Sequence, residues 1–233
     1  GDIGAFIVAM ANANYGRHRF FSDPPLAAIT DHNCIFSTAL LCVKTMAHLI
    51  LASSSPRRRE LLAQLGLSFD VYSPDIDESV HLGENVAAYV ERLARAKAAA
   101  VIEKFPKALV IAADTSLGVD GKILGKPESK AHAFAMWQLI SNRQHDVFSG
   151  VCVRTQDQIS SIVVRTEVEF QALSTQDMED YWATGEPVGK AGGYAIQGIA
   201  ARYIPKIHGS YSNVVGLPLY ETVQLLTAFK ALN

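Results

Sequence analysis

From residue 46 onward, short apolar runs alternate along the chain with longer stretches in which apolar residues recur every three or four positions. Short apolar runs such as "HLILA" (48–52) and "ALVIAAD" (108–114) are typical of buried strands. Longer stretches, with apolar residues three or four apart, are typical of helices. The pattern predicts, in chain order, a strand at 48–52, a helix from Pro56 to Gly66, a strand at 69–79 that runs into an acidic turn, a helix at 84–104, a strand at 108–114, a helix at 128–141, strands at 145–155 and 159–173, a helix that begins at Ser174, and a helix at 217–229. Strands that alternate with helices indicate an α/β architecture.

Local signals mark the ends of several of these elements. Asp120-Gly121 predicts a two-residue hairpin turn, because a type I′ turn needs positive φ at both central positions. Ser174 and Asp177 have the spacing of a capping box at a helix start. Pro218 suits the first turn of the last helix. No internal repeat or low-complexity segment interrupts this order.

Three consecutive arginines, Arg57 to Arg59, lie at the predicted start of the first helix. The first turn of a helix exposes unpaired N–H groups and the positive end of the helix dipole, so cations there lower stability unless an anion is present. Ser53 to Ser55 form a polar turn before it, with Ser55 as the cap and Pro56 at the first helical position. This strand, turn and helix start predict a phosphate site, although the Walker A pattern is absent. Alternatively, the arginines are solvated surface charges.

Lys97 interrupts an apolar stripe on the long helix. Val86, Val90, Leu93 and Val101 share one face of the predicted helix, and Lys97 falls on that face between Leu93 and Val101. An inward-facing ammonium needs a partner. Lys97 therefore either extends its stem to the surface or points into a cleft and meets an anion there.

The segment "AADTSLGVDGKILGKP" places another set of polar groups close together. If Asp120 and Gly121 form the turn, Val119 pairs with Lys122, and counting outward places Thr115 opposite Lys126. Asp114 then lies beside them, after an apolar strand, where open α/β sheets usually place ligand chemistry. A structural ion pair is the alternative interpretation of this cluster.

Composition limits the class of ligand. The chain has 233 residues, of which 49% are hydrophobic, enough for the core of one domain or two closely joined lobes. A formal net charge of −2 gives no electrostatic footprint for duplex nucleic acid. Small ligands therefore fit the sequence better than polyanions.

Cysteine and histidine give no sign of a metal site of their own. Cys34, Cys42 and Cys152 form no CxxC pair, which makes a zinc knuckle or a disulfide framework an unfavoured interpretation. The seven histidines are scattered and form no HExxH pair. We expect a reducing compartment, the cytoplasm, and no membrane partner.

Residues 1–45 differ from the rest because they have no clear amphipathic period. Their longest apolar run, around 35–43, is far too short to span a membrane. Asp2 and the lack of a basic residue before Ala11 argue against a signal peptide. Regular patterning begins at Met46, so the expectation is that Met46 is the natural start and that 1–45 are a non-native or mis-assigned extension.

The cations and carboxylates together suit hydrolysis of a bond between phosphates. This reaction needs a metal or base to prepare a water, and positive groups to stabilise the charge that develops on phosphoryl oxygens. Carboxylates and phosphate oxygens are hard ligands, so the expected cofactor is a divalent cation, Mg²⁺ or Mn²⁺. The candidate carboxylates are Asp77, Glu78 and Asp114, and the candidate cations are Arg57, Arg58, Lys97 and Lys126.

Six separated motifs from about Met46 to the last helix resemble, in the expected order, the Maf family of nucleoside triphosphate pyrophosphatases, named for an association with septum formation. They are "LILASSSPRRRELLAQLG", "DIDES", "RLARAKA", "AADTSLGVDGKILGKP", "AGGYAIQG" and "GSYSNVVGLPL". The resemblance leaves residues 1–45 uncovered.

The resemblance implies a fold, a reaction and an assembly. The fold would be an elongated, twisted mixed sheet flanked by helices, with two lobes around a central cleft, related to the inosine triphosphate pyrophosphatases. The reaction would release a nucleoside monophosphate and pyrophosphate with a divalent cation. Members of the family often form dimers, so a homodimer is the candidate assembly, and the oligomeric state stays open at this point.

Site residues follow from the same resemblance. Asp114 would be the proton acceptor and, with Glu78, a metal ligand. The phosphate and metal region would also include Ser53, Arg57, Arg58, Lys97 and Lys126. Whether Asp114 acts mainly as base or as metal ligand stays open at this point.

Three of the matched positions concern the base. The subgroup that hydrolyses dTTP and UTP carries an arginine after the first-motif proline, a threonine after the catalytic aspartate and a glutamine in the glycine-rich motif. This sequence has Arg57, Thr115 and Gln197 there. A glutamine amide both donates and accepts, which suits the O4 and N3–H edge shared by uracil and thymine. The expected substrates are therefore dTTP and UTP, with modified pyrimidine nucleotides left open.

A second class of function also fits the resemblance. The chain would then be a non-catalytic regulator of septum formation that binds a nucleotide or a protein. The set of Asp114, Lys97 and Lys126 favours the enzyme, because a pure binder does not need a water-activating carboxylate beside the phosphates. Pyrophosphate release from a panel of nucleoside triphosphates separates the two classes.

Overall fold

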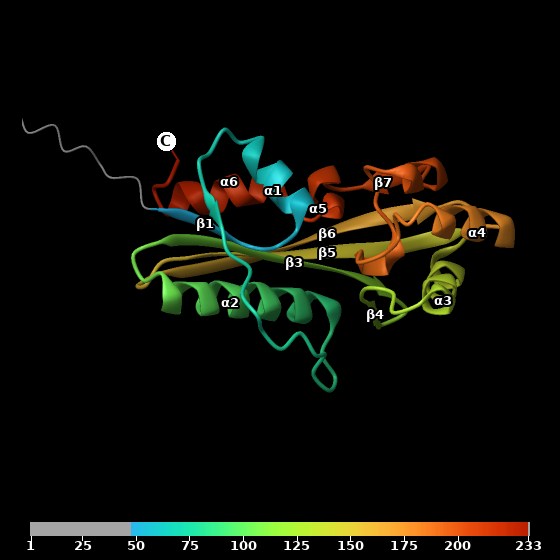
Figure 1. Ribbon diagram of the computed structural model, residues 1–233, viewed down its shortest axis with the longest axis horizontal. Helices are drawn as coiled ribbons and strands as arrows, with labels where there is room; N and C mark the ends of the chain where they lie inside the picture. The colour runs from blue at the N-terminus through green and yellow to red at the C-terminus, as the bar shows by residue number, and fades with distance from the viewer. Residues whose placement is uncertain (1–47, 233) are drawn as a thin grey trace, which may run out of the picture. The chain divides into compact units, whose positions relative to one another are not determined.

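The computed structural model describes residues 48–232, and these form one seven-stranded mixed sheet with helices on both faces (Figure 1). The expected extension at 1–45 lies outside the described residues. The strands are β1 Leu49–Ala52, β2 Asp70–Val71, β3 Leu109–Val119, β4 Lys122–Leu124, β5 Arg143–Arg154, β6 Ile159–Phe170 and β7 Lys206–His208. The helices are α1 Pro56–Ala63, α2 Val86–Lys104, α3 Lys130–Ile140, α4 Thr175–Ala183, α5 Tyr211–Val215 and α6 Leu219–Ala228, with 3₁₀ turns η1 Ala191–Gly193 and η2 Ile199–Tyr203.

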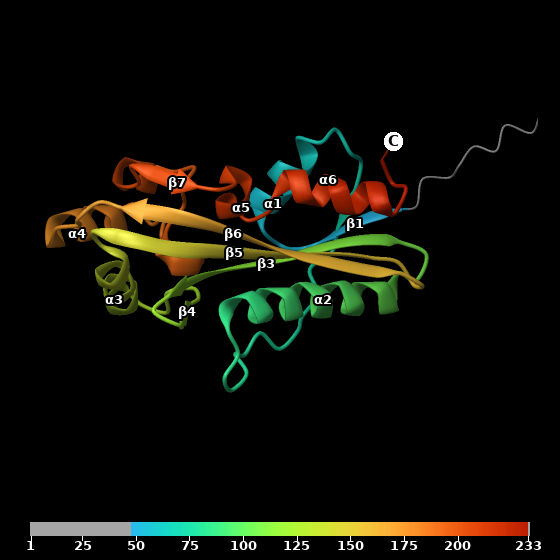
Figure 2. The ribbon, with the colours of Figure 1, turned by 180° about the vertical axis from the view of Figure 1, so that it is seen from behind.

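The α/β class and the mixed sheet are confirmed. The strand order is β2-β1-β3-β5-β6-β7, with β4 paired to β3. The pairs of β1 with β2 and with β3 are parallel, and the remaining pairs are antiparallel. Figure 2 shows from behind that α2 covers one face of the sheet while α1, α5 and α6 cover the other.

Helices on both faces explain why β1 and the first half of β3 are continuous apolar runs. Along β3, alternate side chains point to opposite faces. Val110 and Ala112 pack in the cluster that includes α2 residues, whereas Ile111 and Ala113 pack in the cluster with α1 and α6. Continuing this alternation, Asp114 faces α2 and Thr115 faces the α1 and α5 side.

The predicted helix starts are confirmed at the level of their caps. Ser55 accepts the N–H of Arg58 at the start of α1, and Pro56 is the first helical residue. Ser174 and Asp177 form the predicted capping box of α4. The strand predicted at 69–79 is much shorter than expected, because only β2 pairs with β1.

The hairpin between β3 and β4 has the predicted turn but a shorter ladder. Asp120 and Gly121 have φ of 49° and 73°, and Val119 pairs with Lys122. The ladder ends at the pair Leu117 and Leu124, so the predicted alignment of Thr115 with Lys126 is wrong. The chain leaves β3 here because the next carbonyl, that of Gly125, accepts the N–H of Gly192 at 2.8 Å.

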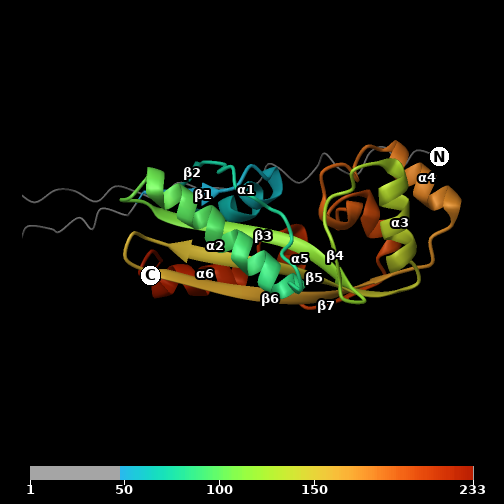
Figure 3. The ribbon, with the colours of Figure 1, turned by 90° about the horizontal axis from the view of Figure 1, so that it is seen from below.

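Helix α2 lies unusually close to the sheet. Figure 3 shows it running along the sheet, with α3 and α4 toward the other end. Gly150 in β5 pairs with Asp114 in β3, and a Cβ on Gly150 would lie 2.4 Å from the carbonyl oxygen of Val90 in α2. Only glycine allows this approach. Within residues 48–232, no helix combines the length and the apolar character needed to cross a membrane.

Candidate active site

A cavity of about 360 Å³ opens where β1 ends and β3 continues. Ala52, the last residue of β1, lines it, and so do residues of the turn into α1. All the site residues that the family resemblance implies line this one cavity: Ser53, Arg57, Arg58, Glu78, Lys97, Asp114, Thr115, Lys126 and Gln197. The structure therefore brings together groups from segments up to 144 positions apart, from 53 to 197.

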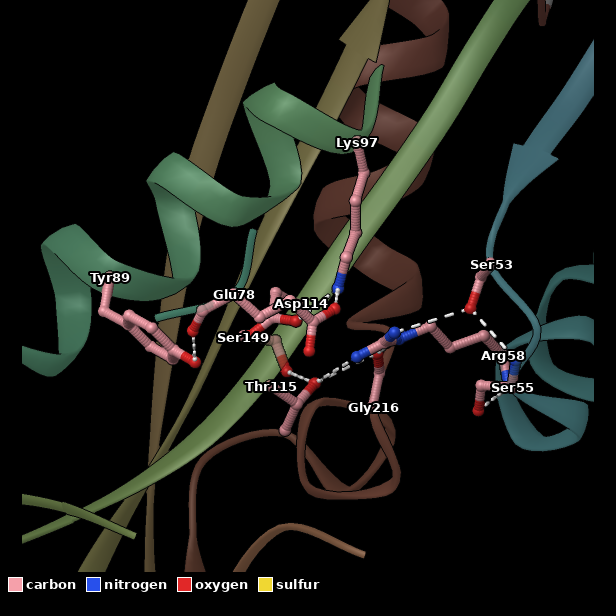
Figure 4. A network of polar contacts seen from close by, with 10 residues as sticks. All are labelled: Ser53, Ser55, Arg58, Glu78, Tyr89, Lys97, Asp114, Thr115, Ser149 and Gly216. Atoms are coloured by element: carbon pink, nitrogen blue, oxygen red, sulfur yellow. Dashed lines mark hydrogen bonds and ion pairs between the residues drawn. The ribbon is translucent and has the colours of Figure 1, made fainter. Parts of the chain in front are cut away.

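Lys97 joins two carboxylates on the α2 side of the cavity (Figure 4). Its ammonium donates to Asp114 Oδ1 and to Glu78 Oε1, each at 2.7 Å. Lys97 is 9% exposed and Asp114 8%, whereas the Glu78 side chain is 43% exposed. Of the two alternatives for Lys97, the inward-facing one is correct, and the anions that it meets are these two carboxylates.

The opposite side of the cavity is organised by Arg58. Its guanidinium donates to the carbonyl of Gly216 at 2.8 Å and to the hydroxyl of Thr115 at 3.0 Å, with a longer contact to Ser53 at 3.5 Å. The Thr115 hydroxyl also shares a hydrogen bond of 2.8 Å with that of Ser149 on β5. Figure 4 shows that these groups reach the site from β3 and β5, from the turn before α1 and its first residues, and from the residue after α5.

Burial and neighbouring charges shift the pKa values of several groups in this site. Burial lowers the pKa of Arg58, against the opposing effect of Asp114, and burial also lowers the pKa of Arg57. Burial acts to raise the pKa of Glu78, but the hydrogen bond and charge of Lys97 outweigh it, so the pKa lies below its ordinary value. Because arginine stays protonated in proteins even when it is buried, Arg57, Arg58 and Glu78 are all charged at neutral pH.

Two of the charged residues singled out in the sequence lie away from the cavity. Arg59 is exposed and does not line it. Asp77 is also outside, because its side chain accepts the N–H of Ser79 at 2.8 Å and closes a local turn. That hydrogen bond holds the pKa of Asp77 below its usual value.

Sequence reasoning missed several residues of the site. Tyr89 on α2 lines the cavity, and its hydroxyl donates to the carbonyl of Glu78 at 2.9 Å. Burial raises the pKa of Tyr89 to about 12, so the hydroxyl stays protonated. A signal existed, because Tyr89, Leu93 and Lys97 are spaced four residues apart on one helix. Ser149 and Gly216 had no such signal, since their roles depend on strand pairing and on a loop.

The described residues form no metal cage at this site on their own. Among residues 48–232, no group of three or more histidine, cysteine, aspartate or glutamate side chains is arranged to hold a metal ion. Glu78 and Asp114 each use one oxygen on Lys97 and keep a second oxygen available. Two carboxylates of this kind fit a divalent cation whose remaining ligands are water and substrate phosphates.

Comparison with known proteins extends the similarity over nearly all described residues. Residues 48–229 match the family described as Maf-like protein. A dTTP/UTP pyrophosphatase of Acinetobacter baylyi is 66% identical over 183 residues, which are 78% of this chain and 100% of the relative. Proteins of the same name are 52% identical in Myxococcus xanthus, covering 76% of this chain and 90% of the relative, and 49% identical in Pseudoalteromonas atlantica, covering 77% and 95%. The chain therefore belongs to the Maf family.

Proposed function

We propose that this protein is a nucleoside triphosphate pyrophosphatase that hydrolyses dTTP and UTP to the monophosphate and pyrophosphate. The observation that carries the proposal is the contact of the buried Lys97 with Asp114 and Glu78, which lie across one cavity from Arg58. The relatives named dTTP/UTP pyrophosphatase support the choice of substrate.

The chain's own residues supply base and charge stabilisation. The Asp114 carboxylate accepts a proton from the attacking water. The water oxygen adds to one of the two phosphorus atoms of the α–β bridge, and the bond from that phosphorus to the bridging oxygen breaks. The products are the nucleoside monophosphate and pyrophosphate. Lys97 holds the Asp114 carboxylate in place through the 2.7 Å contact. Arg57, Arg58 and Lys126 stabilise the negative charge that develops on the phosphate oxygens.

Serine hydroxyls and backbone N–H groups at the start of α1 receive the phosphates. Ser53 and Ser55 lie at this end, where the positive end of the helix dipole adds to the arginine charges. The anion that the arginines lack is then the triphosphate itself.

A divalent cation, Mg²⁺ or Mn²⁺, belongs to the proposal. Glu78 and Asp114 would hold it together with phosphate oxygens. When bound, it would neutralise phosphate charge and polarise the phosphoryl groups.

Gln197 is proposed to read the base. It is exposed and lines the cavity, with its amide free to donate and accept at the O4 and N3–H edge of uracil or thymine. A methylated, positively charged guanine would instead favour a carboxylate or an aromatic face.

The deciding experiment measures pyrophosphate release and kcat/KM for UTP, dTTP, CTP, ATP, GTP and 7-methyl-GTP. We expect dTTP and UTP to be preferred by about tenfold to a thousandfold, because unmet polar groups in a pocket discriminate strongly. A preference for 7-methyl-GTP would refute the base assignment. Nucleotide binding without pyrophosphate release would favour the non-catalytic regulator.

The arrangement of the chain adds three further proposals. The clusters around α3 and α4 and around α1 and α6 are the cores of two lobes, with the cavity as the cleft between them.

Residues 46–233 form the pyrophosphatase domain. A truncation that begins at Met46 should therefore keep the activity of the parent protein, and a loss of activity would contradict this proposal. The assembly is a homodimer, which light scattering of the purified chain tests directly.

A further inference from the structure

Glu186 lies outside the catalytic contacts, yet it makes an unusual number of hydrogen bonds. Its carboxylate accepts the Tyr181 hydroxyl at 2.6 Å and the backbone N–H groups of Ile199 and Ala200 at 2.9 and 3.3 Å. Burial acts to raise the pKa of Glu186, but these hydrogen bonds outweigh it and hold the pKa below its ordinary value. The group is therefore a charged acceptor for three donors, and such hydrogen bonds are the strong ones.

Tyr181 extends the same contacts to the other side of Gln197. Its hydroxyl accepts the N–H of Ala195 at 3.2 Å while it donates to Glu186. The ring is 4% exposed and packs beside Trp137, with centroids 5.3 Å apart. Glu186 and Tyr181 thus fix the backbone at Ala195 before Gln197 and at Ile199 after it.

Gly198 shows how closely the carboxylate approaches this backbone. A Cβ on Gly198 would lie 2.2 Å from Glu186 Oε2, so a side chain directly after Gln197 would displace the Glu186 carboxylate. The backbone on either side of Gln197 is held, whereas its side chain is exposed at the cavity. A held backbone limits where the Gln197 amide reaches, and this lowers the entropy lost when the amide meets a base.

We propose that Glu186, acting with Tyr181, is a positioning residue that aims Gln197 at the nucleotide base and so determines base preference. The inference rests on the proposed function only for the identity of the base. It assigns Glu186 no contact with the substrate and no step of the reaction.

The test replaces Glu186 with glutamine, which keeps the volume but turns one acceptor into a donor facing backbone N–H groups. We expect kcat/KM for UTP to fall on the order of tenfold, mainly through KM, as for the loss of one hydrogen bond to a charged group. The kcat/KM for ATP, whose base does not match the Gln197 amide, should stay within about twofold of the parent value. The UTP to ATP ratio therefore falls about tenfold, whereas a merely structural role would lower both values equally and overturn the proposal.

Glu179→Gln is the matched control. Glu179 lies in α4, but it is half-buried and pairs with Lys130 away from the cavity. The same change of charge there leaves the UTP to ATP ratio unchanged. A drop in the ratio equal to that of Glu186→Gln would show that lost charge alone explains the effect, and would overturn the proposal.

A double-mutant cycle tests whether Glu186 acts through Gln197. In a Gln197→Ala background, Glu186→Gln has no further effect on the ratio if the proposal is correct. A further tenfold fall in that background would overturn it. If Glu186→Gln does not fold, Tyr181→Phe supplies the same test, because it keeps the ring and removes the hydroxyl. We expect the UTP to ATP ratio to fall about threefold in this variant.

Equilibrium binding separates this inference from the proposed function. The same ratio is measured with non-hydrolysable analogues of UTP and ATP, which need no turnover. A parent protein that binds with base preference but releases no pyrophosphate would refute the pyrophosphatase, and the binding ratios of the variants would still decide the role of Glu186. A parent protein that binds both analogues equally would overturn the inference.

Discussion

Asp114→Asn tests the proposed base with little change to the fold. The two side chains have nearly the same volume, and residue 114 stays paired through its backbone with Gly150 in β5. Lys97 loses the charge of one partner but keeps the contact with Glu78 at 2.7 Å. We expect the free energy of unfolding to fall by roughly 1.5 to 3 kcal/mol, the contribution of one hydrogen bond to a charged group. The free energy of unfolding of a domain is typically about 5 to 15 kcal/mol, so the variant stays folded.

The effect on turnover is expected to be much larger than the effect on folding. An amide accepts a proton from water far less readily than a carboxylate does, so kcat should fall at least about a hundredfold. This corresponds to about 2.7 kcal/mol in the activation barrier. Pyrophosphate release at saturating UTP measures kcat, and urea unfolding of the same sample measures stability.

Asp120→Asn is the control for this prediction. Asp120 lies in the turn that follows β3, is exposed and pairs with Arg143 at 2.7 and 2.8 Å, outside the cavity. Asparagine tolerates its positive φ of 49°, so this variant should keep parent turnover. If Asp114→Asn also turned over UTP at nearly the parent rate, Asp114 would not be the base.

Other perturbations follow from the same contacts. Burial lowers the pKa of His145 to about 3, so the folded state disfavours protonation, and stability should fall by about 1.4 kcal/mol per pH unit below pH 6.5 toward pH 3. Urea titrations of His145→Phe should show a flatter pH dependence, and an unchanged slope would contradict this. Lys97→Met leaves Glu78 and Asp114 facing each other unpaired, so unfolding free energy should fall by roughly 1 to 3 kcal/mol; equal stability would count against the contact. Gln197→Glu should lower the preference for UTP over 7-methyl-GTP at least about tenfold, as an unpaired charge meets the pyrimidine carbonyls. EDTA should abolish turnover and added Mg²⁺ or Mn²⁺ restore it, whereas full activity in EDTA would remove the metal from the proposal.

The elements most accessible from the sequence were those with local causes. The caps at Ser55 and Ser174 and the turn at Asp120-Gly121 depend on residues within a few positions of one another, and the structure has them as predicted. Lys97 was also accessible, because an isolated charge on an apolar helical face needs a partner somewhere. Its two partners, however, come from other segments, and although both were candidate carboxylates, no local pattern indicated that they pair with Lys97.

The parts that could not be predicted depend on long-range geometry. The ladder of β3 and β4 stops early because Gly125 binds Gly192, far along the chain. The hydrogen bond of Thr115 with Ser149 requires the register of β3 on β5, which no local pattern encodes. Glu186 gave no signal either, since its two backbone donors follow it by 13 and 14 positions, at the start of η2.

The glycine at position 150 makes the reaction depend on a residue without a side chain. An alanine there would press its methyl group against the backbone of α2 at Val90, and the helix that carries Lys97 would have to move away from Asp114. A substitution at Gly150 would therefore disturb the Lys97–Asp114 contact, although Gly150 has no functional group of its own. A redesign of this scaffold for another substrate has to treat this glycine as fixed from the outset, along with the charged groups it brings together.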